Sequence, residues 1–543
     1  DVMLNFNYNI NRFDIAATVG WTGRYENMNN IRVSTNGGLV TENWFDLNAS
    51  RYTPSSTLQR MELLKTGYMG TLSLGWDNYL FLELTGRQER SSTLKDQSFF
   101  YPSANLSFLF TQAFHMPSWW NYGKLRLSYG IVGNAPETYT ANIVYEQGSD
   151  NGFTWNTIPS SWGNADIRPE KKYEYEIGLE SKFLNNRLGI DVSYYNNRVK
   201  DQILSTPQPS TSGVKNVLMN VGEVANHGWD ISISATPILT RDFRWDLTAN
   251  YGVYKNKVVK LADGVPYLEI LNSGGSGIKI QAVEGQPMGD IYAQVPQVNE
   301  NGEYLVSDKG LYLNQTELQK VGNINPAGVG GLFNSFSYKN VFLDFSIDFR
   351  IGGDVINEMN QYATAVGLTP ESLKYRDTEH GGLSYYYPGD NNSSGIPVQV
   401  DPSTGAGPNG EIIYHDGIIL PGVVASTGER NTRIIPAGYY YNTTYNWGTE
   451  AEQLTYRHSV FDNSYVKLRE LTIGYQFPEK MISKLGLGRL SVSVFGRNLF
   501  YFYKALKNYD AESSVGTSWA NQATVGSSTT ATRSFGVSLR ASF

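Results

Sequence analysis

The chain closes with the stretch Arg533–Phe543, RSFGVSLRASF, in which apolar and polar residues alternate without a break. The apolar residues at every second position are Phe535, Val537, Leu539, Ala541 and Phe543. A period of two places one set of side chains on each face of a β-strand. We predict a final strand with one apolar face, and we interpret Phe535, Val537, Leu539 and Phe543 as a C-terminal signal for barrel assembly.

The same alternation recurs along the chain, most clearly in Phe243–Val253. Further examples lie in 2–10, 13–21, 68–84, 125–131 and 173–183. A soluble sheet of this extent would need a second layer to cover its apolar face, and amphipathic helical stretches are nearly absent. No run of about twenty apolar residues offers a membrane-spanning helix. The pattern therefore predicts an all-β protein, an antiparallel transmembrane β-barrel.

The connections between these segments fall into two classes of length. Short turns are expected near Asn11, Asp77–Asn78, Asn185–Asn186, Thr240–Arg241 and Lys339–Asn340. Long polar loops are expected near 24–58, 134–167, 255–276, 353–460 and 503–531, and 476–489 reads as a moderate turn with one helical turn. Short turns at one end of the strands and long extracellular loops at the other are typical of outer-membrane barrels.

The number of strands bears on whether the sheet closes. If residues 277–326 add no spanning strand, the chain supplies about fifteen strands, whereas bacterial single-chain barrels have an even number. An open edge in lipid would leave backbone groups without hydrogen bonds, at several kcal/mol each. Residues 1–543 are therefore predicted to be the C-terminal part of a larger barrel, with 353–460 as the largest loop.

Composition narrows the possible partners. The formal net charge of -7 gives no reason to expect nucleic acid. Cysteine is absent, which excludes disulfide frameworks and thiolate chemistry. The 37 Tyr, 24 Phe and 11 Trp residues suit a barrel that needs aromatic girdles where it meets lipid head groups.

Several motifs carry a family resemblance. From about residue 80 onward the chain resembles the SusC-like branch of TonB-dependent outer-membrane transporters of Bacteroidota. The matching segments, in the family's order, are LFLELTGRQERSS (Leu80–Ser92), YPSANLSF (Tyr101–Phe108), LRLSYGIVGN (Leu125–Asn134), Arg168–Leu204, NVGEVANHGWDISISATPI (Asn220–Ile238), VEGQPMGDIYA (Val283–Ala293), FDNSYVKLRELTIGYQFP (Phe461–Pro478) and LSVSVFGRNLFYFYK (Leu490–Lys504).

The resemblance implies a location, partners and a function. Members are integral to the outer membrane, in contact with its lipid, and have an N-terminal plug, a TonB-contacting box and a barrel of about twenty-two strands. Neither plug nor box is found in this chain. By resemblance, the protein imports oligosaccharides or peptides with a SusD-like surface lipoprotein, in a possible dimer of such pairs, using energy delivered by TonB through a missing N-terminal segment. The alternative is a structural subunit of a larger outer-membrane assembly or secretion complex, without solute transport.

Catalytic and metal chemistry find little support, so we predict no enzyme and no cofactor. The five histidines, His115, His227, His380, His415 and His458, lack the spacing of a zinc site. No Gly-x-Ser-x-Gly nucleophile motif is present, and Gly274–Gly277 lacks the Lys-Ser/Thr of a phosphate loop. Charged residues on the polar faces of strands either line a solute path or serve the structure; they are Glu174, Glu176, Glu180, Asp191, Asp242, Arg244, Asp246, Asp344, Asp348 and Arg350.

Aromatic residues in the loops are candidate ligand contacts. The largest loop holds two runs of three tyrosines and a tryptophan: Tyr385, Tyr386, Tyr387, Tyr439, Tyr440, Tyr441 and Trp447. Exposed aromatic faces present a large apolar area at low entropic cost, and loops this long are usually functional. We predict contact with ligand or with the lipoprotein lid here; packing within the loop is the alternative. Trp119 and Trp120, in a shorter connection, are expected in a girdle.

Overall fold

The chain divides into two compact units, which are described separately. The structure is a computed structural model. It describes residues 1–95, 98–150, 153–273, 277–389, 395–446, 455–514, 516, 518–526 and 531–542. Unit 1 consists of Asp1–Ile231 with Asn256–Pro266, and unit 2 of Ser232–Lys255 with Tyr267–Phe543. No helix in these described ranges is long and apolar enough to cross a membrane.

Fifteen strands form the largest sheet, and each lies next to its predecessor in the chain. In order they are β1 (Val2–Ile10), β2 (Phe13–Leu39), β3 (Ser50–Trp76), β4 (Leu80–Ser91), β5 (Ser98–Phe108), β6 (Trp120–Asn134), β10 (Glu170–Phe183), β11 (Leu188–Lys200), β14 (Glu223–Leu239), β15 (Phe243–Lys260), β21 (Gly328–Tyr338), β22 (Val341–Ile351), β30 (Tyr465–Gln476), β31 (Arg489–Lys504) and β32 (Ser534–Ser542). The predicted all-β antiparallel fold and the strand count are confirmed. As expected, the strands found within 277–326 lie outside this sheet.

Short and long connections alternate along the sheet, as predicted. The five expected tight turns all join successive strands. Asn11, Asp77, Asn186 and Lys339 adopt positive φ values of 53°, 53°, 63° and 51°. Asn and Asp tolerate this left-handed conformation better than other residues with a side chain, which explains why these sequences turn where they do. The turn after β30 contains the short helix α4 (Glu479–Ile482), matching the expected helical turn.

The predicted loop at 24–58 is wrong. β2 and β3 continue as one antiparallel pair from Phe13–Trp76 to Leu39–Ser50, so only 40–49 joins them. About nine to eleven residues suffice for a strand to cross the hydrocarbon core, so the 27-residue strands extend well beyond it. Polar residues on both faces removed the alternation on which the prediction depended, yet the backbone ladder needs no apolar face where water is present.

The smaller elements of unit 1 lie in its connections. They are α1 (Phe110–Ala113), β7 (Glu146–Asp150), β8 (Phe153–Thr157), β9 (Ser161–Trp162), β12 (Ile203–Pro207), β13 (Asn216–Asn220) and the 3-10 turns at Leu47–Ala49 and Ser210–Ser212. A small core of Leu94, Phe99 and Ile167 packs these connections together. Trp119 stacks on Trp120 with ring centroids 6.0 Å apart beside the β10–β11 turn, and their role in a girdle stays a prediction.

The long connections of unit 2 contain many short elements. They are β16 (Tyr267–Ser273), β17 (Ile278–Val283), β18 (Asp290–Ala293), β19 (Leu305–Val306), β20 (Gln319–Asn323), β23 (Asp354–Ile356), α2 (Glu358–Ala365), β24 (Leu383–Tyr386), β25 (Val398–Gln399), β26 (Tyr414–Ile418), β27 (Val423–Val424), β28 (Ile435–Pro436), α3 (Ala437–Tyr445), β29 (Val460–Asp462) and 3-10 turns at Pro370–Leu373, Tyr456–Ser459, Ser483–Leu485 and Asn521–Ala523.

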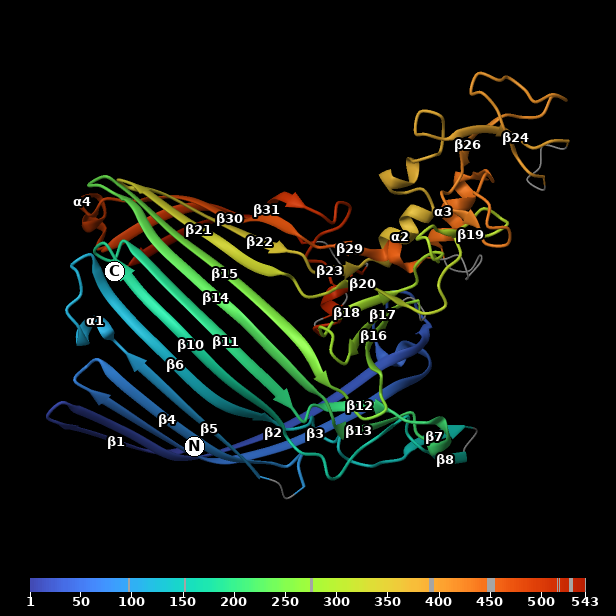
Figure 1. Cartoon of the computed structure of the whole chain (residues 1–543). Coiled ribbons are helices and arrows are strands. Elements are labelled where there is room, and N and C mark those ends of the chain that lie inside the picture. Colours follow the sequence, from blue (N-terminus) through green and yellow to red (C-terminus); the bar gives the residue numbers. More distant parts are fainter. Residues whose placement is uncertain are drawn as a thin grey trace. The chain divides into compact units, whose positions relative to one another are not determined.

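Three connections of unit 2 fold into one packed body. We call the described residues within 267–327, 352–464 and 505–526 the loop assembly. Its main core joins Ile280 and Ile291 from the first connection, Ile356 from the second and Ala523 from the third. Figure 1 shows α2, α3, β24 and β26 at the end of unit 2 opposite α4. These loops are therefore a folded structure with its own hydrophobic interior.

The sheet itself leaves its apolar face uncovered in both units. In unit 1 the exposed side chains of β10 are Tyr175, Ile177 and Leu179, at 47%, 48% and 45% of full exposure. In unit 2, Phe535, Val537 and Leu539 of β32 are exposed as well. Phe543, the last member of the proposed assembly signal, lies outside the described residues. Large exposed apolar surfaces mark contact with protein or membrane.

Candidate functional site

On the polar face of unit 1, Arg126 of β6 lies between two carboxylates. Its Nη2 is 2.6 Å from Asp191 Oδ1, and its Nη1 is 3.6 Å from Glu180 Oε2. Nη2 also donates to the hydroxyl of Ser193 at 3.2 Å. The sequence predicted Glu180 and Asp191 on this face but missed their partner. Arg126 could have been found, because it occupies the polar position between Leu125 and Leu127.

A second cluster lies in the arginine-containing strand that resembled the family motif. Arg87 Nη2 is 2.7 Å from Glu89 Oε2. The Tyr101 hydroxyl donates to the same Glu89 oxygen at 2.7 Å and accepts from Arg87 Nε at 3.1 Å. The Glu89 side chain is only 12% exposed, and its charge is compensated by these two neighbours. The cluster fixes β4 to β5 on the polar face.

A row of polar side chains crosses three strands of the same unit. Lys172 Nζ is 2.6 Å from Glu174 Oε2, and Asn197 Nδ2 donates to that oxygen at 3.1 Å. Asn226 Nδ2 in turn donates to Asn197 Oδ1 at 2.8 Å. The row runs from β10 through β11 to β14. Glu174 thus has a structural partner on each side, and it also lines a hollow on this face together with Glu176, so both roles left open by the sequence stay predictions.

The charged residues that the sequence predicted on the polar face of unit 2 differ in their positions and partners. Arg244 Nε is 2.5 Å from Asp246 Oδ2, and Thr236 donates to Asp246 at 2.8 Å. Asp242 falls in the β14–β15 turn, outside the strands. Arg350 donates to the backbone carbonyl of Ile324 at 2.9 Å, so it binds the end of the first connection of the loop assembly.

The densest charge cluster surrounds an irregularity in β30. Arg469 is skipped in the ladders with both β22 and β31, a β-bulge on each side. Beside it, Asn498 of β31 has a positive φ of 53° and accepts from Arg469 Nη1 at 3.0 Å. Arg469 also binds Asp348 through Nε at 3.1 Å, and Glu512 through Nη1 at 2.9 Å. Bulges commonly redirect a side chain near functional sites.

This cluster ties the third long connection to the sheet. Glu512 lies in 505–533, and besides Arg469 it pairs with Lys467, whose side chain is 2% exposed. The Lys467 ammonium also lies 4.8 Å from the ring centroid of Tyr501. Of these residues only Asp348 was predicted. The bulge inverts the alternation between Lys467 and Glu470, so a strict period of two could not place both on the polar face.

The predicted tyrosines of the largest loop are mostly interior. Tyr385 and Tyr387 are 1% and 5% exposed and share a core with Ile434. Tyr385 donates to Asp416 Oδ1 at 3.1 Å, and burial raises its pKa. Tyr441, 4% exposed, donates to the Glu371 carbonyl at 2.9 Å. Burial raises the pKa of Tyr441 to about 12. Tyr385 and Tyr441 thus pack inside the loop assembly, whereas Tyr387 both packs there and lines a cavity.

The other predicted aromatic residues differ in position. Tyr386, Tyr439 and Tyr440 are half-buried, and Tyr439 and Tyr440 pack against the core that contains Ile435. Trp447 lies outside the described residues. Ligand or lid contact by this set stays a prediction, and it is strongest for Tyr387 and Tyr439, because both line a cavity.

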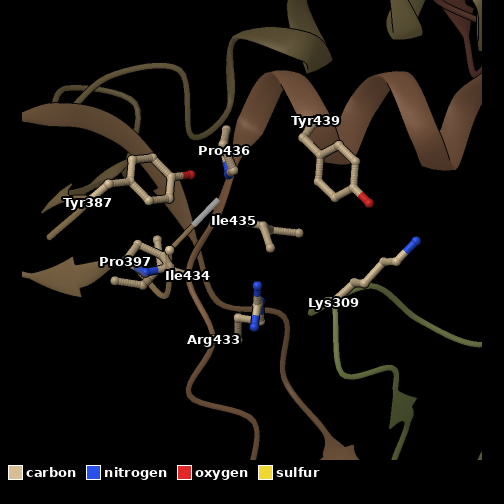
Figure 2. A pocket seen from close by; sticks show the side chains of 9 residues that line it. Lys309, Tyr387, Pro397, Arg433, Ile434, Ile435, Pro436 and Tyr439 are labelled. Carbon is tan, nitrogen blue, oxygen red and sulfur yellow. The ribbon is translucent and has the colours of Figure 1, made fainter. Parts of the chain in front are cut away.

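That cavity, of about 310 Å³, lies within the loop assembly. Figure 2 shows Tyr387 and Pro397 on one side, Tyr439 and Lys309 on the other, and Arg433 and Ile435 between them. Burial raises the pKa of Tyr387, and the nearby positive charge of Arg433 opposes this shift. The tyrosine runs indicated Tyr387 and Tyr439, but no local pattern indicated Lys309 or Arg433, because the walls come from three segments spread over 309–439.

Histidine side chains in the loop assembly serve its structure. Ser384 Oγ and His415 Nδ1 are 2.8 Å apart, but Ser384 is 2% exposed, so a substrate cannot reach its hydroxyl. His458 stacks on Tyr445 at 4.3 Å, and burial lowers its pKa to about 4. Among the described residues no group of three His, Asp or Glu side chains could hold a metal ion.

The fold and its two faces define a class of protein. A long meander of antiparallel strands with one uncovered apolar face, one face of ion pairs and alternating short and long connections is a transmembrane β-barrel protein. Comparison with known proteins then gives the family. The family described as TonB dependent receptor-like, beta-barrel matches residues 2–289, and the chain belongs to it. It is accordingly a protein of the outer membrane, in a family of transporters that are not enzymes.

Individual relatives confirm the resemblance to the SusC-like branch. TonB-dependent receptor P3 of Formosa agariphila is 24% identical over 494 residues, covering 83% of this chain and 42% of the relative. TonB-dependent receptor SusC of Bacteroides thetaiotaomicron is 30% identical over 247 residues, covering 42% of this chain and 24% of SusC. The chain thus spans less than half the length of these curated relatives.

A solved structure supports the fold independently. The RagAB peptide transporter aligns with a TM-score of 0.65 at 18% identity, covering 92% of this chain and 51% of that one. At this identity the likeness concerns the fold alone, and it extends over nearly all of the chain. The aligned 92% of the chain is larger than the fraction of the chain in the fifteen-stranded sheet, so the likeness includes connections as well as strands.

Proposed function

We propose that this protein imports oligosaccharides or peptides across the outer membrane, with energy delivered through TonB and with a SusD-like lipoprotein closing over its loops. The observation that carries the proposal is the loop assembly, in which three connections share one core of fully buried residues such as Ile280, Ile291 and Ile356. Capturing a solute needs a surface that keeps its shape, because ordering loose loops would cost binding free energy.

Two further features support import. The polar sheet face carries paired charges, such as Arg126 with Asp191, which suit a hydrated path and the binding of a plug. Exposed apolar residues on the second connection suit a lipoprotein lid: Val366 and Leu368 are 62% and 78% exposed, and Leu373 is 50% exposed. Peptide transport is a property of RagAB itself, so for this chain both the substrate and the lid belong to the proposal.

Uptake by the native host tests the proposal. The full-length gene would be deleted, and growth on single oligosaccharides and on peptide mixtures would be compared with that of the parent strain. We expect loss of growth on one class of nutrient, restored by the full-length gene and not by a version whose TonB-contacting segment is removed. Unchanged growth and uptake on every nutrient, together with copurification with secretion components, would instead support a structural subunit.

A further inference from the structure

The cavity in the loop assembly is built from three separate segments. Lys309 comes from the connection between β19 and β20, Tyr387 and Pro397 follow β24, and Arg433 precedes β28. Its volume of about 310 Å³ falls at the lower end of the range for small-molecule sites. A single sugar ring or one amino-acid side chain with its backbone is of this size.

The walls of the cavity are held by two hydrophobic cores. Ile435, 3% exposed, belongs to the core with Leu311 and Ile418. Tyr387 and Ile434, also buried, belong to the core with Tyr385. The cavity lies where these cores meet, so its shape exists before any ligand arrives. A preformed cavity spares the ordering cost that weakens binding to loose loops.

The described residues that line the cavity include two cations, Lys309 and Arg433, and no acidic side chain. Asp308, next to Lys309 in sequence, accepts from the Ser426 hydroxyl at 2.6 Å. Asp416, whose negative charge acts on Tyr387, accepts from Tyr385 at 3.1 Å. Lys309 is engaged in an interaction within the chain, so Arg433 is the cation considered for a ligand.

Arg433 is the better placed of the two cations. Its backbone N–H donates to Asn431 Oδ1 at 3.0 Å, which fixes the main chain beside the cavity. Its side chain is half-buried, and within the described part of the chain no carboxylate pairs with its guanidinium. A guanidinium presents five N–H donors in a planar fork that matches carboxylate and sulfate oxygens. A partly desolvated cation of this kind favours an anionic ligand.

We propose that this cavity binds an anionic group, a carboxylate or sulfate ester, carried on a unit the size of one sugar ring or amino acid. Arg433 binds the anion through its fork, and Tyr387, Tyr439 and Ile435 contact the body of the unit. This inference rests on the proposed function and sharpens it, because it makes the imported solute acidic. The anion could belong to an acidic sugar or to an acidic peptide.

Binding of four matched probes to the purified full-length protein tests the inference. Tri-galacturonate is compared with neutral galactotriose, and tri-glutamate with tri-glutamine, by isothermal titration calorimetry in detergent. We expect at least one acidic probe to bind more tightly than its neutral counterpart, by about tenfold, as charge-assisted bidentate contacts allow. We expect Arg433→Gln to abolish that preference. Arg430→Gln, which removes an exposed charge three residues away, should change affinity less than about twofold.

The outcomes separate the source of the anion from the validity of the inference. A preference confined to tri-galacturonate identifies sugar acids, one confined to tri-glutamate identifies peptides, and either supports the site. No preference for either acidic probe, or equal losses from Arg433→Gln and Arg430→Gln, overturns it. If Arg433→Gln does not fold, Arg433→Lys, which keeps the charge and removes the planar fork, takes its place and should weaken the preference for the acidic probe. Import by the native host without a charge preference refutes this inference alone; acid-dependent binding without import refutes only the proposed function.

Discussion

Aliphatic residues occupy opposite environments in the sheet and in the loop assembly. On the sheet, Ile473 and Leu539 are 54% and 69% exposed; in the loop assembly, Ile280 and Ile291 are fully buried. The loop assembly gains stability by removing apolar surface from water inside the protein. The sheet depends on lipid to cover its apolar face and on its backbone ladder for hydrogen bonds. The sheet and the loop assembly thus depend on different sources of stability. Separate measurements of the stability of each region should distinguish them.

The largest expected effect comes from a substitution that opens a cavity in the core of the loop assembly. Ile280→Ala removes buried methylene groups from the main core, so we expect the loop assembly to lose about 3–4 kcal/mol. Leu539→Ala, on the uncovered face, should cost about 0.5 kcal/mol. Limited proteolysis of the full-length protein reports on the loops, and migration of unheated protein on a denaturing gel reports on the sheet.

The comparison predicts which readout changes in each variant. Ile280→Ala should accelerate cleavage within 352–464 and leave the migration of the unheated protein unchanged. If it destabilised both regions equally, the loop assembly would not be an independent fold, and the contrast would fail.

A pair of neighbouring substitutions sharpens the contrast between the two faces of the sheet. Ile473→Arg places a charge on the apolar face, where lipid exposure should cost about 2–4 kcal/mol near the bilayer centre. Thr472→Arg places the same charge on the polar face, where Thr472 donates to Glu470 at 3.3 Å. We expect this second change to cost less than about 1 kcal/mol. Urea unfolding in phospholipid vesicles measures both, and equal losses would contradict the assignment of the faces.

Within unit 2, the ion cluster at the β30 bulge attaches the third connection of the loop assembly to the sheet. Glu512→Gln leaves the buried Lys467 ammonium without its carboxylate, and Arg469 keeps only Asp348. Removing one partner of a buried ion pair costs about 3–5 kcal/mol. Here we expect about 2–3 kcal/mol, since the Glu512 side chain is 31% exposed.

The readout for this variant is proteolysis between 505 and 526, which should accelerate while cleavage within 352–389 stays unchanged. Asp510→Asn is a matched control: it removes a charge from the same connection. There Asp510 accepts from Tyr501 at 2.7 Å and from the Glu512 N–H at 2.9 Å, and it forms no ion pair with any described residue. Equal effects of the two substitutions would show that the cluster does not hold this connection.

The sequence predicted the sheet far better than the loop assembly, for a physical reason. Apolar residues at every second position, such as Tyr175, Ile177 and Leu179, follow from the pleat of a β-strand, which is a local property. Strands and turns could therefore be predicted from short stretches of sequence. The loop prediction failed at 24–58, where polar residues on both faces of the strands leave no alternation. The contacts of Ile280 with residues such as Ile356 and Ala523 depend on long-range packing that no local period encodes. The same holds for Arg469, whose bulge breaks the period, and for Arg433, whose cavity joins distant segments.

The smallest effect uses pH to act on the loop assembly alone. Burial lowers the pKa of His458 from 6.5 to about 4. At pH 7 the imidazole is neutral in the folded state and mostly neutral in the unfolded state. Between about pH 6.5 and 4 only the unfolded state takes up the proton, so the stability of the loop assembly should fall across this window. Each pKa unit corresponds to about 1.4 kcal/mol, and partial exposure of the ring reduces the total to about 2 kcal/mol.

His458→Phe isolates this contribution, because it keeps a ring to stack on Tyr445 and removes the titrating group. The rate of proteolysis within 352–464, measured from pH 7 to 4, should rise less steeply in the variant than in the parent protein. Gel migration of the sheet should respond to pH equally in both, since carboxylates elsewhere titrate in either protein. A variant with the parent's pH profile would show that the imidazole is not desolvated in solution. The loop assembly would then be more open to water than the fully buried Ile280 and Ile291 require, and its contrast with the sheet would weaken accordingly.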